Sequence, residues 1–112
     1  GNTAESTIVG FGGCLMAAQV TQPNVKFALG QIVGTPGAIQ AMDQLNMTLW
    51  QLLSRHQHGD WGDLDTEDWQ ANNRALQTGE RLFSAYIVQH MKFWVITEAD
   101  RSATTILLPE EY

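Results

Sequence analysis

Three extended runs in the C-terminal third constrain the fold of this chain more than any other feature. Each run is rich in β-branched and aromatic residues, the types that favour strands: "RLFSAYIV" (81–88), "KFWVITEA" (92–99) and "ATTILLP" (103–109). Only the short segments "QHM" and "DRS" link them. Because such short links join neighbouring antiparallel strands, the pattern predicts a C-terminal meander in a three- or four-stranded antiparallel sheet.

The middle of the chain shows a helical pattern instead. Thr35 is a suitable N-cap, Pro36 suits the first helical position, and apolar residues follow on one helical face. Similar patterns predict about three helices, near residues 36–45, 48–58 and 66–78. Together with the strands, they predict an α+β fold whose helices pack mainly on one face of the sheet.

Both faces of the predicted sheet carry apolar side chains, since Phe93 and Val95 alternate with Trp94 and Ile96. The helices are expected to cover one face, and the N-terminal segment or a second subunit the other. A chain of 112 residues suits a single domain. Residues 1–26 are expected to be an arm or an extra strand of that domain.

The N-terminal stretch "IVGFGGCLMAA", Ile8 to Ala18, is apolar, but three glycines interrupt it and no basic residue precedes it. It is too short to span a bilayer and lacks the basic flank of a signal peptide. Cys14 is the single cysteine, so it cannot form an internal disulfide, and we interpret it as an apolar filler. These features predict a cytoplasmic protein without a membrane segment.

The charge of the chain narrows the class of partner. Its formal net charge is −6, with only six Lys and Arg. Binding to the phosphate backbone of nucleic acids needs clustered basic side chains, so direct nucleic-acid binding is not expected. We expect a protein partner or a homo-oligomer instead.

The stretch "RHQHGDWGDLDTED", Arg55 to Asp68, combines histidines and aspartates, which are common ligands of divalent metal ions. His56 and His58 are two residues apart, however, and such residues do not face each other on a helix. No C-x-x-C or H-E-x-x-H motif is present. Asp65 and the acids after it are typical of a helix N-terminus. We therefore expect neither a metal site nor a cofactor.

The turn "GDWG" within this stretch holds Trp61 between two acids. Its indole either fills the core or is displayed to a partner, and the size of the ring favours the core. In that interpretation Asp60 and Asp63 are expected to bridge locally, to Arg55 or Arg81.

The segment "TEADRSATT" is the second candidate for chemistry. Glu98 and Arg101 can act as acid, base or clamp in a cleft, with His56 and Asp60 as the other catalytic candidates. This hypothesis requires that the two segments meet. The alternative is a charged hairpin tip in which Asp100 bonds to the local backbone.

Three longer segments carry a resemblance to a known family: "LGQIVGTPGAIQAM", "LLSRHQHGDWGDLDTEDWQANNRALQTGERLFSAY" and "WVITEADRSATTILLPEEY". In order and spacing they resemble small proteins carried on bacterial plasmids, prophages and other mobile elements, which are described as plasmid-related or uncharacterised. The resemblance covers residues 29–112. It implies a mobile element as the context and no particular activity.

Some members of that family are labelled as a modification subunit of type I restriction enzymes. A methyltransferase needs a cofactor-binding parallel sheet and an Asn-Pro-Pro-Tyr type motif, and this chain shows neither. The residues that the family pattern repeats are Arg55, His56, Gly59, Asp60, Trp61, Gly62, Arg81, Ser84, Tyr86, Thr97, Glu98, Asp100, Arg101, Thr104 and Thr105.

The sequence as a whole favours a non-enzymatic accessory protein of a bacterial mobile element that acts by binding another protein. The candidates for its binding surface are Arg55, Trp61, Asp63, Arg81, Asp100 and Thr104. The alternative is a small hydrolase or nuclease-like enzyme that uses His56 and Asp60 with Glu98 and Arg101.

Overall fold

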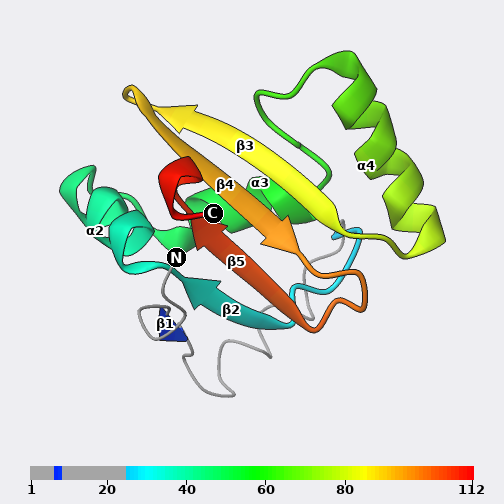
Figure 1. The fold of residues 1–112 in the computed structure, drawn as a ribbon, viewed down its shortest axis with the longest axis horizontal. Helices are drawn as coiled ribbons and strands as arrows, with labels where there is room; N and C mark the ends of the chain where they lie inside the picture. Colours follow the sequence, from blue (N-terminus) through cyan, green and yellow to red (C-terminus); the bar gives the residue numbers. More distant parts are fainter. Residues whose placement is uncertain (1–6, 9–24) are drawn as a thin grey trace.

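The computed structural model describes residues 7–8 and 25–112 and has an α+β fold, as predicted (Figure 1). The helices are α2 (Pro36–Gln44), α3 (Leu49–Gln57), α4 (Thr66–Thr78) and the 3₁₀ turn η2 (Pro109–Glu111). The strands are β1 (Thr7–Ile8), β2 (Gln31–Gly34), β3 (Leu82–Val88), β4 (Met91–Thr97) and β5 (Ala103–Leu107).

The C-terminal meander is confirmed, because β3 pairs antiparallel with β4 and β4 pairs antiparallel with β5. The strand order is β1-β2-β5-β4-β3. The chain also places β2 parallel to β5, a pairing that the sequence patterns did not predict. The two-residue β1 joins the outer edge of β2 in antiparallel orientation.

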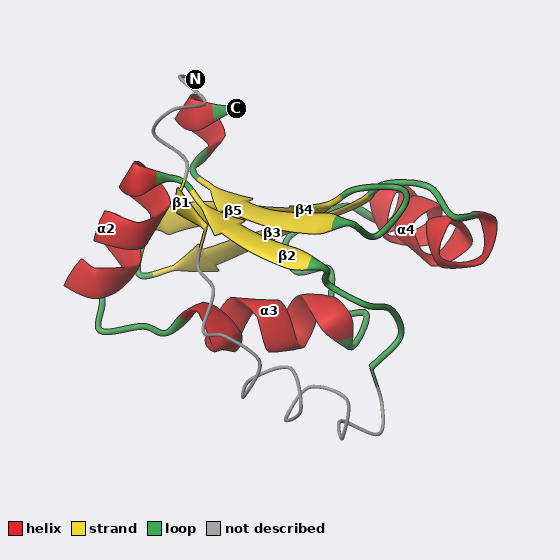
Figure 2. Cartoon of the chain, turned by 90° about the horizontal axis from the view of Figure 1, so that it is seen from below, coloured by secondary structure: helices red, strands yellow, loops and turns green. Residues whose placement is uncertain are grey.

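The layers follow from this sheet (Figure 2). Helix α3 lies across one face, and α2 and α4 flank opposite ends of the sheet. The turn η2 returns to the other face. The main core lies between α3 and the sheet and includes Leu52, Leu53, Tyr86, Phe93, Val95 and Ile106. A smaller cluster beside α4 contains Trp61, Ala75 and Leu82.

Local chemistry fixes the ends of the helices much as the sequence predicts. The Thr35 side chain accepts the N–H of Ala38, and Pro36 occupies the first turn of α2. Asp65 likewise accepts the N–H of Asp68 at the start of α4. Gly79 ends α4 with a left-handed φ of 77°, which costs glycine little.

None of the helices in the described part of the chain is long and apolar enough to cross a membrane. Of the apolar stretch Ile8 to Ala18, only Ile8 belongs to the described residues, and it lies in β1. The interpretation of Cys14 falls outside them.

Candidate functional site

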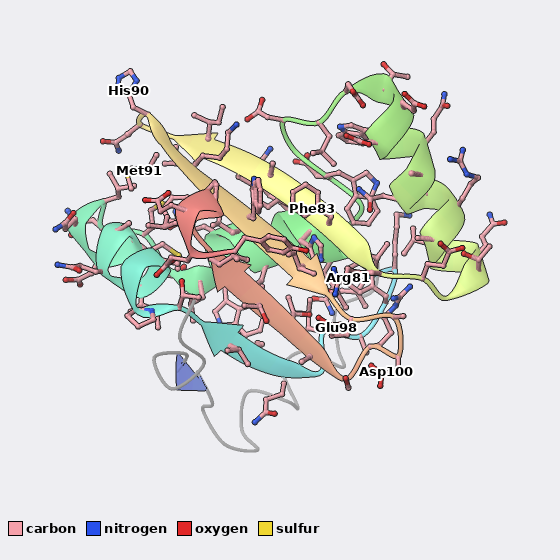
Figure 3. All side chains as sticks on the ribbon, viewed as in Figure 1. Arg81, Phe83, His90, Met91, Glu98 and Asp100 are labelled. Carbon is pink, nitrogen blue, oxygen red and sulfur yellow. The ribbon has the colours of Figure 1, made fainter. Side chains whose placement is uncertain are left out.

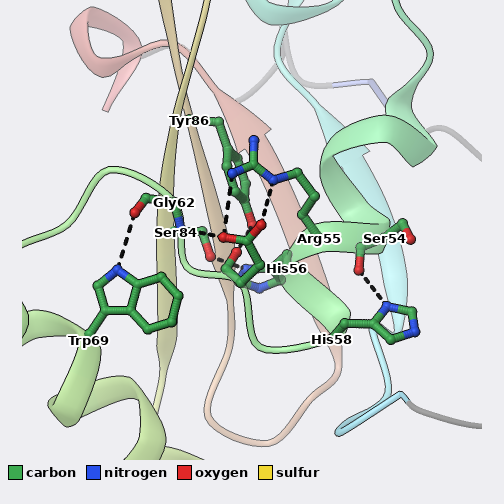
Figure 4. A network of polar contacts seen from close by, with 9 residues as sticks. Ser54, Arg55, His56, His58, Gly62, Trp69, Ser84 and Tyr86 are labelled. Carbon is green, nitrogen blue, oxygen red and sulfur yellow. Dashed lines mark hydrogen bonds and ion pairs between the residues drawn. The ribbon is translucent and has the colours of Figure 1, made fainter.

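The imidazole of His56 lies between α3 and the sheet with no exposed surface. Its Nδ1 is 2.5 Å from the Ser84 hydroxyl on β3 (Figure 4). Its Nε2 is 2.9 Å from the Thr97 hydroxyl on β4. Thr97 in turn lies 2.7 Å from the hydroxyl of Thr104 on β5, which donates to the carbonyl of Leu29 at 2.7 Å. A buried polar chain therefore crosses the sheet beneath α3.

The direction of every hydrogen bond in this buried polar chain follows from the Leu29 carbonyl, the acceptor at which it ends. The Leu29 carbonyl can only accept, so Thr104 uses its proton there and must accept from Thr97. Thr97 then has no proton left for His56, so the Nε2–H of His56 donates to Thr97. Nδ1 is consequently bare and accepts the Ser84 hydroxyl. One neutral tautomer of His56 satisfies the whole chain.

Burial reinforces this neutral state. Desolvation, helped by the positive charge of Arg101, lowers the pKa of His56 to about 3. A serine beside a neutral histidine is the arrangement of a nucleophile and its base. Ser84 and His56 both have no exposed surface, however, so in this conformation the pair ties α3 to the sheet.

A second network closes the turn after α3 (Figure 4). Arg55 Nε donates to the Asp60 carboxylate at 2.7 Å, and its guanidinium lies 4.5 Å from the centre of the Tyr86 ring. The Tyr86 hydroxyl donates to the Asp60 carbonyl at 2.7 Å. The hydrogen bond from Arg55 lowers the pKa of Asp60 below its usual range. The predicted bridge from Asp60 to Arg55 is confirmed.

Trp61 fills the core beside this turn with no exposed surface. Its indole N–H donates to Asn73 at 3.0 Å, and its ring meets those of His56 and Phe27 at centroid distances of 5.5 and 6.2 Å. The core-filling interpretation is confirmed. Of the binding-surface candidates, Trp61 is therefore buried in this structure. Thr104 is also buried, and its hydroxyl belongs to the polar chain.

The same turn covers the outer edge of β3. Gly62 has φ +80°, and a Cβ at this position would lie 2.0 Å from the Ala85 carbonyl. This close approach lets Asp63 N–H donate to the Ala85 carbonyl, and Ala85 N–H to the Trp61 carbonyl. Glycine is required here because both the space and the backbone angle exclude a side chain.

Asn72 on α4 continues this cover at Phe83, two residues before Ala85 on the same strand. Its side-chain N–H donates to the Phe83 carbonyl at 2.6 Å, and its side-chain oxygen accepts the Phe83 N–H at 3.0 Å. The amide thus occupies the place that a neighbouring strand would take.

The catalytic candidate Arg101 is bound to backbone carbonyls. It has φ +60°, and its Nη1 donates to the carbonyls of Glu80, Glu98 and Ala99 at 2.7–3.2 Å. Its Nη2 donates to the Ala75 carbonyl at 3.1 Å. Arg101 therefore ties the β4–β5 turn to the C-terminal end of α4.

The two candidate segments approach each other across the ring of Phe27. This ring lies 5.1 Å from the His56 imidazole and 5.7 Å from the Arg101 guanidinium carbon. Asp60 is held by Arg55, and Glu98 lies 3.6 Å from Arg81 in a half-exposed ion pair. Each of the four catalytic candidates thus has an internal partner.

The remaining predicted site residues lie at the surface. Asp63 and Arg81 are exposed, and the exposed Asp100 accepts the N–H of Ser102 at 3.0 Å, as expected for a hairpin tip. His58 bonds to the Ser54 carbonyl at 2.7 Å near the C-terminal end of α3. Over residues 7–8 and 25–112, no group of three His, Cys, Asp or Glu side chains could hold a metal ion.

The face of the sheet opposite α3 is the one for which the sequence predicts the N-terminal segment or a second subunit as cover (Figure 3). Trp94 lies at its centre, with its ring 5.1 Å from that of Phe83 and 5.6 Å from that of Tyr112. We call this surface the open face and define it by the residues on it that are at least partly exposed: Arg81, Phe83, Ile87, Lys92, Trp94, Glu98 and Tyr112. Ile87 and Tyr112 are 50% and 70% exposed.

The alternation of apolar residues on both sides of β4 was the available signal for the open face. The sequence did not show that, among the elements described at residues 25–112, the 3₁₀ turn η2 is the one that lies on this side of the sheet.

No family model matches the sequence, and neither a curated protein nor a solved structure matches it.

Proposed function

We propose that the protein is a non-enzymatic accessory protein of a bacterial mobile genetic element, acting in the cytoplasm by binding a protein through the open face. The observation that carries this proposal is the exposure of Ile87 and Tyr112. They are the large apolar side chains that the described part of the chain leaves exposed, and both lie on this one face. A cluster of exposed apolar side chains within a polar rim is typical of protein interaction sites.

The internal partners of the polar candidates support the same function. His56, Ser84, Thr97 and Thr104 are buried in one hydrogen-bonded chain, and Arg101 donates to four carbonyls. Groups held in this way stabilise a scaffold and are not free to meet a substrate. The residues of the open face have no comparable set of internal bonds.

The context of the proposal comes from the motifs. The segments that resemble the plasmid and prophage family favour a mobile element, and the net charge of −6 disfavours direct contact with nucleic acid. Family membership remains a proposal that rests on these motifs.

A hydrolase or nuclease-like enzyme stays the alternative prediction. The 2.5 Å contact between the Ser84 hydroxyl and His56 Nδ1 has the geometry of a nucleophile and its base, but both groups are fully buried and the pKa of His56 is lowered to about 3. The enzyme requires a conformation in which the polar chain opens to solvent. Hydrolysis of simple ester or phosphodiester substrates that is lost in Ser84→Ala, with the fold retained, would support the enzyme over the binding protein.

The binding function is tested by immobilising the full chain and comparing capture from a bacterial lysate. Ile87→Ser and Tyr112→Ser remove exposed apolar surface and should abolish capture while leaving the thermal melt nearly unchanged. Gln70→Ser, an exposed position on α4, is the matched control and should capture like the wild type. Equal capture by all of these variants would contradict the proposal.

A further inference from the structure

We propose that the buried polar chain beneath α3 is a two-state relay that couples the segment 26–30 to the GDWG turn (59–62). This inference goes beyond the proposed binding function and does not depend on it. One end of the polar chain lies on the segment, and the other end approaches the turn. Its hydrogen bonds can run in either of two directions, and the position of the segment selects one of them.

The segment 26–30 supplies the acceptor at one end of the polar chain. Its Leu29 carbonyl accepts the Thr104 hydroxyl at 2.7 Å. The Gln57 side chain on α3 donates to the Phe27 carbonyl at 2.9 Å and holds the segment in place. Alternate residues of the segment are exposed, so a partner can reach it.

The GDWG turn supplies the acceptor at the other end. Burial raises the pKa of the Tyr86 hydroxyl, and a hydrogen bond with Ser84 opposes this rise. A hydrogen bond that lowers the pKa of a phenol is one that the phenol oxygen accepts, so the Ser84 hydroxyl can donate to Tyr86. Tyr86 in turn donates to the Asp60 carbonyl at 2.7 Å. The proton of Ser84 therefore has two acceptors within reach, Tyr86 and His56 Nδ1.

The polar chain has two complete orders of hydrogen bonds. In the order that the Leu29 carbonyl fixes, every group donates towards Leu29, and Nε2 of His56 carries the imidazole proton. In the reverse order Thr97 donates to Nε2, the Nδ1–H donates to Ser84, and Ser84 donates to Tyr86. A hydroxyl carries one proton and a neutral imidazole one N–H, so mixed orders leave a buried donor without an acceptor, which is costly. The groups therefore switch together.

The position of the segment decides which order is stable. When the segment moves away, Thr104 loses the Leu29 carbonyl and its proton is free for Thr97, which favours the reverse order. The imidazole keeps one proton throughout, because Nε2 gives a proton to water and Nδ1 takes one from water while the segment is away. Since coupling between two sites is reciprocal, a partner that binds the GDWG turn in one order also changes how firmly the segment 26–30 is held.

Nitrogen-15 spectra of the His56 imidazole at pH 7 test the relay in the full chain. Thr104→Val removes the hydroxyl between Thr97 and the Leu29 carbonyl. It should move the imidazole proton from Nε2 to Nδ1, so that the chemical shifts of the two nitrogens exchange. Thr104→Ser keeps the hydroxyl and should keep the Nε2–H tautomer. Thr105→Val, the same change at the neighbouring residue on the other face of β5, should keep it as well.

Thr97→Val gives a second measurement at the next group and keeps the hydrogen bond between Thr104 and Leu29. It removes the acceptor of the Nε2–H, so the proton should again move to Nδ1, where Ser84 can accept it. An imidazole that stays in the Nε2–H tautomer in both Thr104→Val and Thr97→Val overturns the relay.

Gln57→Leu tests the role of the segment. The change removes the donor to the Phe27 carbonyl, so the amides of residues 26–30 should exchange faster with solvent. The shifts of the two imidazole nitrogens of His56 should then move towards those of the Nδ1–H tautomer. Shifts identical to those of the wild type overturn the coupling between the segment and the polar chain.

Discussion

The Glu111 carboxylate accepts the backbone N–H of Gly37 at 3.0 Å and so joins the C-terminal turn to the first turn of α2. It also accepts the Thr35 hydroxyl and the N–H of Leu108. A negative charge at this position satisfies free N–H groups and stabilises the helix dipole. A Cβ at Gly37 would lie 2.6 Å from the carboxylate oxygen, so glycine makes room for it.

We therefore expect Glu111→Ala to destabilise the fold by about 1–2 kcal/mol, as for the loss of a helix cap. Urea unfolding at pH 7 measures this change. Burial raises the pKa of Glu111, but the hydrogen bonds from Thr35 and the backbone outweigh it and leave the pKa lowered. Its stabilisation is thus present above the unfolded pKa and is lost as the pH falls through the folded one. Glu110→Ala, at an exposed neighbour, should have almost no effect.

The buried His56 should make the protein sensitive to acid. Its pKa is lowered to about 3, whereas in the unfolded chain it is about 6.5, so below pH 6.5 the unfolded state binds the extra proton. The contribution of His56 to the free energy of unfolding is complete above pH 6.5 and falls as the pH approaches 3. Between pH 7 and pH 4.5 the loss should be about 2–3 kcal/mol.

Urea unfolding of wild type and His56→Gln across this range measures the histidine contribution, since the carboxylates titrate in both proteins. If the free energy of unfolding fell equally with pH in the two proteins, the prediction would be contradicted. Nitrogen-15 spectra of the imidazole should show the neutral Nε2–H tautomer at pH 5.

Trp61 should be the most sensitive position of the 55–63 segment. Trp61→Ala removes a fully buried indole and should cost about 3–5 kcal/mol, which lowers the melting temperature clearly. Tyr112→Ser, at a largely exposed aromatic residue, is the comparison and should change the melt by much less. An unchanged melt in Trp61→Ala would refute the core-filling role.

The β3–β4 turn offers a gain in stability. Gln89 and His90 have φ +48° and +74°, the left-handed region that most side chains avoid. Asn-Gly is the preferred pair for such a two-residue turn. Gln89→Asn/His90→Gly should therefore stabilise the fold by about 1 kcal/mol in thermal or urea unfolding. A loss of stability would show that the present side chains contribute contacts of their own.

The sequence revealed those parts of the fold that depend on local chemistry. The helix ends are marked by residues that act locally: Thr35, Pro36, Asp65 and Gly79. The three C-terminal strands are marked by β-branched and aromatic residues and by the short segments that connect them. The parallel pairing of β2 with β5 was not predicted, because it joins segments far apart in the chain. It depends on Gly30, where a Cβ would lie 2.4 Å from the Ser102 backbone.

The candidate residues were partly misassigned for the same reason. Ser84, Thr97 and Thr104 are ordinary strand residues in the sequence, and only the fold brings their hydroxyls into one chain with His56. The sequence also could not show that Arg101 would donate to a carbonyl on α4 as well as to carbonyls in its own turn. The open face was visible only as alternation along β4.

The cover over the outer edge of β3 has a consequence for how this chain can assemble. Asn72 and the turn 61–63 occupy the hydrogen-bonding groups of Phe83 and Ala85, which an uncovered strand would offer to the next molecule. Growth of an endless cross-β fibril by strand addition is thereby blocked at this edge. Strand addition beyond β3 is therefore not a route by which copies of this chain can join.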